Sequence, residues 1–131
     1  MKKTITQIAF IALLTLLLAG LMAGKAQAAE IVDSGTCGNN VTWTLDNAGK
    51  LTISGTGSIA GGSSIGPGPW GDSVKAAIIE DGITRIGSRA FWTCDSLTSV
   101  TIPESVTDIG QFAFSGCSSL KSVTIDRKSV V

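Results

Sequence analysis

Three cysteines are the residues of this chain with the widest chemical potential, because a thiol can serve as a nucleophile, a metal ligand or half of a disulfide. Cys37, Cys94 and Cys117 are separated by 57 and 23 residues, whereas structural zinc sites use close pairs such as C-x-x-C. The chain has no histidine, which is the commonest general base and the commonest neutral metal ligand. We therefore expect no metal site.

A glycine pattern, Gly66-x-Gly68-x-x-Gly71, matches the dinucleotide-binding fingerprint on paper. It follows no expected strand and opens no expected helix, and Pro67 and Pro69 lack amide donors that would have to face a pyrophosphate. We therefore expect no cofactor.

Carboxylate pairs in an environment that perturbs their pKa would indicate acid–base catalysis. The available pairs lie beside polar residues in segments expected to be corners, where a solvated surface charge is the simpler interpretation. We expect no enzyme from these residues: Glu80, Asp81, Glu104 and Asp108.

The segment that carries the last two cysteines repeats itself every 23 residues. Recurrent positions are mostly apolar and variable positions are mostly polar. One short unit cannot bury its apolar face alone, so a period in this range predicts units stacked as a solenoid. The copies are VKAAIIEDGITRIGSRAFWTCDS (residues 74–96), LTSVTIPESVTDIGQFAFSGCSS (residues 97–119) and the partial LKSVTI (residues 120–125).

Each repeat predicts a strand, a corner and a compact turn. Alternate residues of Leu97-x-x-Val100-x-Ile102 would point inward, and Pro103 would end the strand because it lacks an amide donor. The chain would turn a corner between Val106 and Gly110. Residues 111–117 are suited to a short helical turn.

Side chains at equivalent repeat positions should lie above one another. Phe91 and Phe114 would stack inside and supply much of the core. Cys94 and Cys117 would lie about one strand spacing apart, roughly 4.7 to 4.9 Å, which is within the Cα range of a disulfide, although adjacent rungs seldom give the required torsion. We favour buried thiols, with a disulfide as the alternative, and Cys37 has no assigned partner.

The residues before the repeats predict a β-hairpin cap and a loop. Val41-Thr-Trp43-Thr-Leu45 and Leu51-Thr-Ile53 alternate apolar and polar residues on either side of a turn at 46–49. Their apolar face would rest on the open end of the stack, since terminal units of solenoids need a cap. Residues 55–71 read as a Gly/Ser/Pro loop, with Trp70 as an anchor to the core.

At this point a resemblance to a known family is specific. The pattern LxxVxIPxxVxxIGxxAFxxC, together with SGTCGNNVTWTLDNAGKLTISGTG before it, resembles the BspA-like leucine-rich repeats of bacterial surface antigens. The match extends over nearly all of residues 34–125, and only Glu80-Asp81-Gly82 departs from it. The resemblance implies a right-handed solenoid, export to the cell surface, and adhesion to or binding of host or matrix components.

The N-terminus has the form of a secretory signal peptide. Lys2 and Lys3 precede an uncharged apolar stretch at 8–24, and Ala26-Gln-Ala gives the small-x-small cleavage pattern. We expect cleavage between Ala28 and Ala29. A retained anchor is the alternative, since the stretch is only just short of the roughly 17 to 25 residues that span a bilayer.

Loss of the leader removes three of the ten basic residues, which leaves seven against ten acidic residues and a net charge of −3. Nucleic-acid binding depends on clustered Lys and Arg, and none cluster here. An anionic membrane surface is disfavoured for the same reason. We expect a secreted or cell-surface protein that binds neither nucleic acid nor membrane once the leader is removed.

The resulting organisation is a signal peptide (1–28), a hairpin cap with its loop (29–73), two complete repeats and one partial repeat (74–125), and a tail (126–131). Two functions are open: recognition of a protein, matrix or host ligand, or a passive spacer in a longer surface protein. The candidate contact residues are the outward positions of the repeated strand, although each singly is also a plausible solvated strand position. They are Lys75, Ala76 and Ile78, then Thr98, Ser99 and Thr101, then Lys121, Ser122 and Thr124.

The repeat register fails after Ile125. Position 126 should resemble Pro103, yet the chain reads DRKSVV and ends. These residues match the translation of gat-cgg-aag-agc-gtc-gtg followed by tag, a common sequencing-adapter read-through, so we interpret 126–131 as an artefact and the chain as a fragment whose last rung exposes Val123 and Ile125. Divergence of a terminal cap is the alternative.

Re-sequencing the locus tests this interpretation. We expect genomic DNA to continue the repeat pattern beyond codon 125. Genomic codons for residues 126–131 followed by a native stop codon would contradict it.

Overall fold

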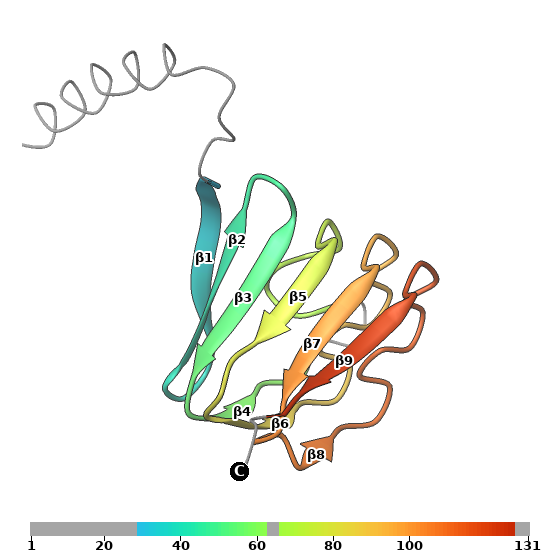
Figure 1. The fold of residues 1–131 in the computed structure, drawn as a ribbon. Coiled ribbons are helices and arrows are strands. Elements are labelled where there is room, and N and C mark those ends of the chain that lie inside the picture. Colours follow the sequence, from blue (N-terminus) through green and yellow to red (C-terminus); the bar gives the residue numbers. More distant parts are fainter. Residues whose placement is uncertain (1–28, 63–65, 128–131) are drawn as a thin grey trace, which may run out of the picture.

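The computed structural model describes residues 29–62 and 66–127, which form a β-solenoid of strands joined by corners and turns (Figure 1). The predicted signal-peptide helix, Ala28 and residues 128–131 lie outside the described residues. The described strands are β1 (Ile31–Gly38), β2 (Val41–Asp46), β3 (Lys50–Gly55), β4 (Gly57–Ile59), β5 (Ala76–Ile79), β6 (Ile83–Ile86), β7 (Ser99–Pro103), β8 (Asp108–Ile109) and β9 (Ser122–Asp126).

The larger sheet has the strand order β1-β2-β3-β5-β7-β9 (Figure 1). β1, β2 and β3 are antiparallel neighbours, and β3, β5, β7 and β9 run parallel. Residues 23 apart pair directly, as Ala77 does with Val100 and Val100 with Val123. The 23-residue repeat is therefore one rung of the stack, and the predicted solenoid is confirmed.

A second sheet, of order β4-β6-β8, lies at the corners and differs from the prediction in two ways. β4 falls within residues 55–71, which were predicted to be a loop, and Ile59 at its end is buried. β8 falls within the corner predicted after Val106, where Ile109 pairs in parallel with Ile86. Strands of two or three residues are too short to produce an alternation, so the sequence pattern did not predict them.

The segment after the second sheet consists of consecutive turns, and the helical turn predicted over residues 111–117 is wrong. Arg89, Thr93 and Phe112 have φ near +60°, which a right-handed helix does not allow. Their backbone groups bond between rungs instead: Arg89 N donates to Gln111 O at 3.0 Å, and Phe91 N donates to Ala113 O at 2.8 Å. The turns therefore add a third ladder to the stack.

Four aromatic rings form a column through the core. Trp43 meets Trp70 edge to face with ring centroids 6.0 Å apart, Trp70 stacks on Phe91 at 5.2 Å, and Phe91 stacks on Phe114 at 5.1 Å. The anchoring role predicted for Trp70 and the stacking predicted for Phe91 on Phe114 are confirmed. The column joins the cap, the Gly-rich segment and both complete repeats.

The two ends of the stack differ. The predicted hairpin, β2 and β3, buries Val41, Trp43 and Leu51 against the first repeat, and β1 extends it by a strand that the sequence did not predict. At the other end Val123 and Ile125 are 51% and 48% exposed, as expected from the sequence. The solenoid is capped at one end and open at the other.

The aromatic column makes Phe91 the most sensitive position of the core. Phe91 is fully buried between two rings, whereas Phe114 is only partly buried. We expect Phe91→Ala to lower the free energy of unfolding by about 3 to 5 kcal/mol, since it leaves a cavity, and Phe114→Ala to cost less. Urea unfolding of the two variants measures this, and equal losses would contradict the column.

Candidate functional site

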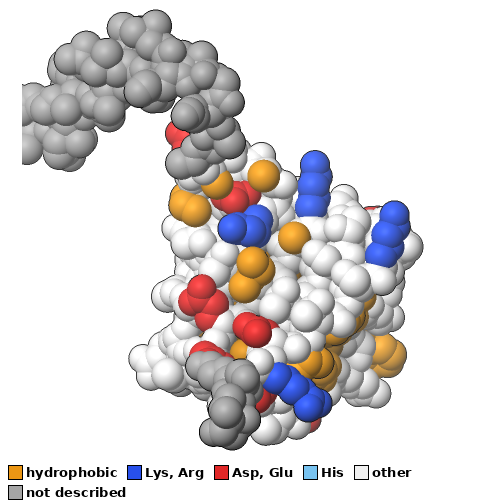
Figure 2. Space-filling view, viewed as in Figure 1, with side chains coloured by type: hydrophobic (Ala, Val, Ile, Leu, Met, Phe, Trp, Pro, Cys, Tyr) orange, Lys and Arg blue, Asp and Glu red, His pale blue; other side chains and the backbone are white. Residues whose placement is uncertain are grey.

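The outward face of the six-stranded sheet brings the predicted contact positions together in rows. Ala76 pairs with Ser99, which pairs with Ser122; Ile78 pairs with Thr101, which pairs with Thr124. Successive strand residues point to opposite faces, and the intervening Ala77 and Val100 are buried. Side chains of these two rows therefore point away from the core, over a face that is largely neither charged nor hydrophobic (Figure 2).

A third row lies at the edge where the parallel strands begin. Thr98 N and Thr98 Oγ1 both donate to Lys75 O, at 2.8 and 2.9 Å, and Lys121 N donates to Thr98 O at 2.9 Å. The Thr98 hydroxyl therefore joins one rung to the next, a role that the sequence did not predict. Lys75 and Lys121 are exposed and make no ion pair within the described residues.

The rows continue across the cap, which sequence reasoning treated only as a support for the core. Lys50 pairs with Ala76 and Thr52 with Ile78, and Thr44 in turn pairs with Thr52. The signal was present in the sequence, because Thr44 and Thr52 are polar members of the alternation that predicted the hairpin. Ile78 thus lies near the middle of the sheet with a threonine on the strand at each side.

The acidic residues serve other places in the fold. Asp108, weighed as an acid–base residue, pairs with Arg85 between two rungs of the second sheet. Asp46 is buried, and its Oδ1 accepts hydrogen bonds of 2.9 Å from Ala48 N and Lys50 N in the turn between β2 and β3. No group of three or more His, Cys, Asp or Glu residues within 29–62 and 66–127 is arranged to hold a metal ion.

All three cysteines are free thiols, which confirms the preferred interpretation over the disulfide. Burial raises the pKa of Cys37 to about 11. Burial, reinforced by the charge of Cys117, raises the pKa of Cys94 to about 12. The Cys117 pKa is also raised, chiefly by burial, and its Sγ donates to Phe91 O at 3.1 Å. These thiols stay protonated at neutral pH and behave as core residues.

The backbone amides of the glycine pattern are engaged within the fold. Gly68 N donates to Ala90 O at 3.0 Å and Gly71 N donates to Gly68 O at 3.2 Å. Those two amides cannot also face a pyrophosphate. In the part of the chain that the structure describes, no helix is long and apolar enough to cross a bilayer.

A stack of strand, corner and turn units with aliphatic residues at alternate inward positions defines a leucine-rich repeat solenoid. A comparison with family models matches residues 70–130 to the BspA type leucine rich repeat region. The repeat region of this chain belongs to that family, which confirms the resemblance read from the sequence.

Two solved structures are similar to this chain. A leucine-rich repeat protein from Eubacterium ventriosum is 34% identical, with a TM-score of 0.63, over 72% of this chain and 26% of its own. A leucine rich cell surface protein from Faecalibacterium prausnitzii is 21% identical, with a TM-score of 0.42, over 80% of this chain and 33% of its own. A comparison with curated proteins gives no match. This chain therefore spans about a quarter to a third of the length of these two proteins.

The raised thiol pKa values predict a loss of stability in alkali. Because Cys37 and Cys94 ionise at higher pH in the folded chain than in the unfolded chain, their contribution is complete below a pH of about 9 and is lost as pH rises toward 11 to 12. We expect the urea midpoint to fall between pH 8 and pH 10 by more than in the Cys37→Ala variant. An equal fall in both would show that the Cys37 thiol does not carry this dependence.

Proposed function

We propose that this chain is a recognition module of an exported surface protein and that it binds a protein or matrix partner through the outward face of its six-stranded sheet. The observation that carries the proposal is the continuity of the outward rows across cap and repeats, from Thr44 through Thr52 and Ile78 to Thr124. A flat face formed by many parallel rungs suits binding by small contributions from each rung. The second sheet, with strands of two to four residues, offers no comparable surface.

The composition of this face suits a protein surface. Ala76 and Ile78 provide a small apolar centre, and hydroxyls on β3 and β7 surround it, which matches the apolar core and polar rim of protein interfaces. Serine and threonine hydroxyls both donate and accept hydrogen bonds. The unpaired ammonium groups of Lys75 and Lys121 at the margin would steer an acidic partner.

The setting that we propose is the cell surface or the extracellular medium. The leader pattern before Ala29 supports export, and the mild net negative charge that follows disfavours nucleic acid and anionic membrane as partners. We propose no catalytic role, because the three thiols are protonated at neutral pH and the outward face consists mainly of hydroxyls.

A passive spacer is the alternative function. It is favoured by one observation, that this chain spans only 26% of the Eubacterium ventriosum protein. In that case a domain elsewhere in a longer protein would bind the partner.

A charge placed in the middle of the face tests the proposal. Chain immobilised from Ala29 onward would be probed with purified extracellular-matrix proteins and with intact host cells. We expect binding, and we expect Thr101→Lys to weaken it about tenfold, equivalent to about 1.4 kcal/mol. The matched control is Thr84→Lys, which places the same change at an exposed position of β6 in the second sheet.

Two outcomes would contradict the proposal. Absence of binding by the parent chain would favour the spacer. Equal weakening by Thr101→Lys and Thr84→Lys, with both variants folded by circular dichroism, would place the binding surface elsewhere.

A further inference from the structure

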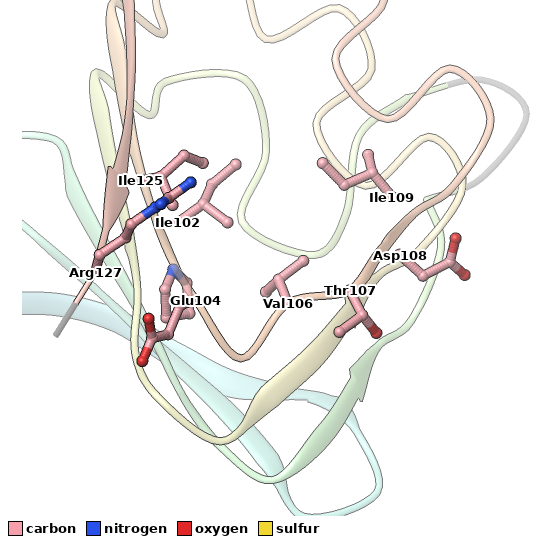
Figure 3. A pocket seen from close by; sticks show the side chains of 9 residues that line it. Ile102, Glu104, Val106, Thr107, Asp108, Ile109, Ile125 and Arg127 are labelled. Carbon is pink, nitrogen blue, oxygen red and sulfur yellow. The ribbon is translucent and has the colours of Figure 1, made fainter. Parts of the chain in front are cut away.

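The end of the stack formed by β8 and β9 exposes a cluster of large apolar side chains. Ile109, Phe112, Val123 and Ile125 are each 47–51% exposed. A hollow of about 450 Å³ opens at this end, with Ile102 and Ile125 on one side and Ile109 on the other (Figure 3). Contiguous apolar surface on a folded chain marks a site of association.

β9 is also an edge strand with a regular free edge. Its five residues, Ser122–Asp126, pair with β7 without a register shift. The opposite edge of the sheet, β1, carries two register shifts, one between Ile31 and Asp33 and one between Thr36 and Gly38. Bulges protect an edge from pairing with another chain, so β9 is the edge that is open to pairing.

The sequence of β9 is complementary to itself. If two copies pair antiparallel about Thr124, Val123 of each copy lies opposite Ile125 of the other, and both pairs lie on the inward face. Asp126, the one charged residue of the strand, then lies opposite the Ser122 hydroxyl, which can donate to its carboxylate. No like charges face each other within the paired strand.

We propose that a second copy of this chain docks here, with β9 pairing antiparallel to β9 about a two-fold axis at Thr124. The interface is isologous and closes as a dimer. It joins the two six-stranded sheets into one and buries Val123 and Ile125 of both copies. The outward face stays free, so this inference does not depend on the proposed function.

Sedimentation velocity of chain from Ala29 onward, over a dilution series, tests the inference, since all described residues are then present. We expect a dimer that dissociates on dilution. Ile125→Lys should sediment as a monomer, because a buried ammonium would have no partner at the interface. The matched control Thr124→Lys changes the same strand on its opposite face and should leave the dimer intact.

Hydrogen exchange of the β9 amides gives a readout without substitutions. We expect those amides that do not bond to β7 to be protected at high concentration and to lose protection on dilution, while β5 amides stay protected throughout. A monomer at all concentrations, a dimer that survives Ile125→Lys, or open-ended assemblies formed through β1 would each overturn the inference.

Discussion

Every rung of this solenoid depends on burial of its inward side chains between its neighbours. The aromatic column from Trp43 to Phe114 shows this dependence most clearly, because each ring is packed on a ring from a different segment of the chain. Phe91, between two rings, is fully buried, whereas Phe114 at the end of the column is only partly buried. Stability in such a stack is approximately a sum over neighbouring pairs, so the cap and the central rungs carry most of it.

The repeat was predictable from the sequence because inward positions recur at a fixed spacing and must be apolar. The same logic predicted the stacked phenylalanines, the free thiols at Cys94 and Cys117, and the burial of Trp43 and Leu51 in the cap. What the sequence did not predict are elements held by backbone bonds between rungs. β4 and β8 are too short for an alternation, and the turns around Arg89 depend on positive φ and on amide bonds to the next rung, which leave no side-chain pattern.

The candidate site was predicted in part for a related reason. Outward positions of β5, β7 and β9 follow directly from the repeat, so their rows could be named in advance. The extension over β2 and β3 requires the parallel pairing of β3 with β5, which joins a non-repeated cap to the first repeat. The role of the Thr98 hydroxyl, bonded to Lys75 O, likewise depends on the distance between rungs. An outward face that contributes little to the core is free to vary, which is what a recognition surface requires.

The most direct test of this account is a nuclear Overhauser spectrum of the aromatic protons. The account predicts cross-peaks from the Phe91 ring to both the Trp70 indole and the Phe114 ring, whose centroids lie 5.2 and 5.1 Å away. Their absence in a folded sample, or a Phe91 ring open to solvent, would show that the repeats do not stack and would contradict the account.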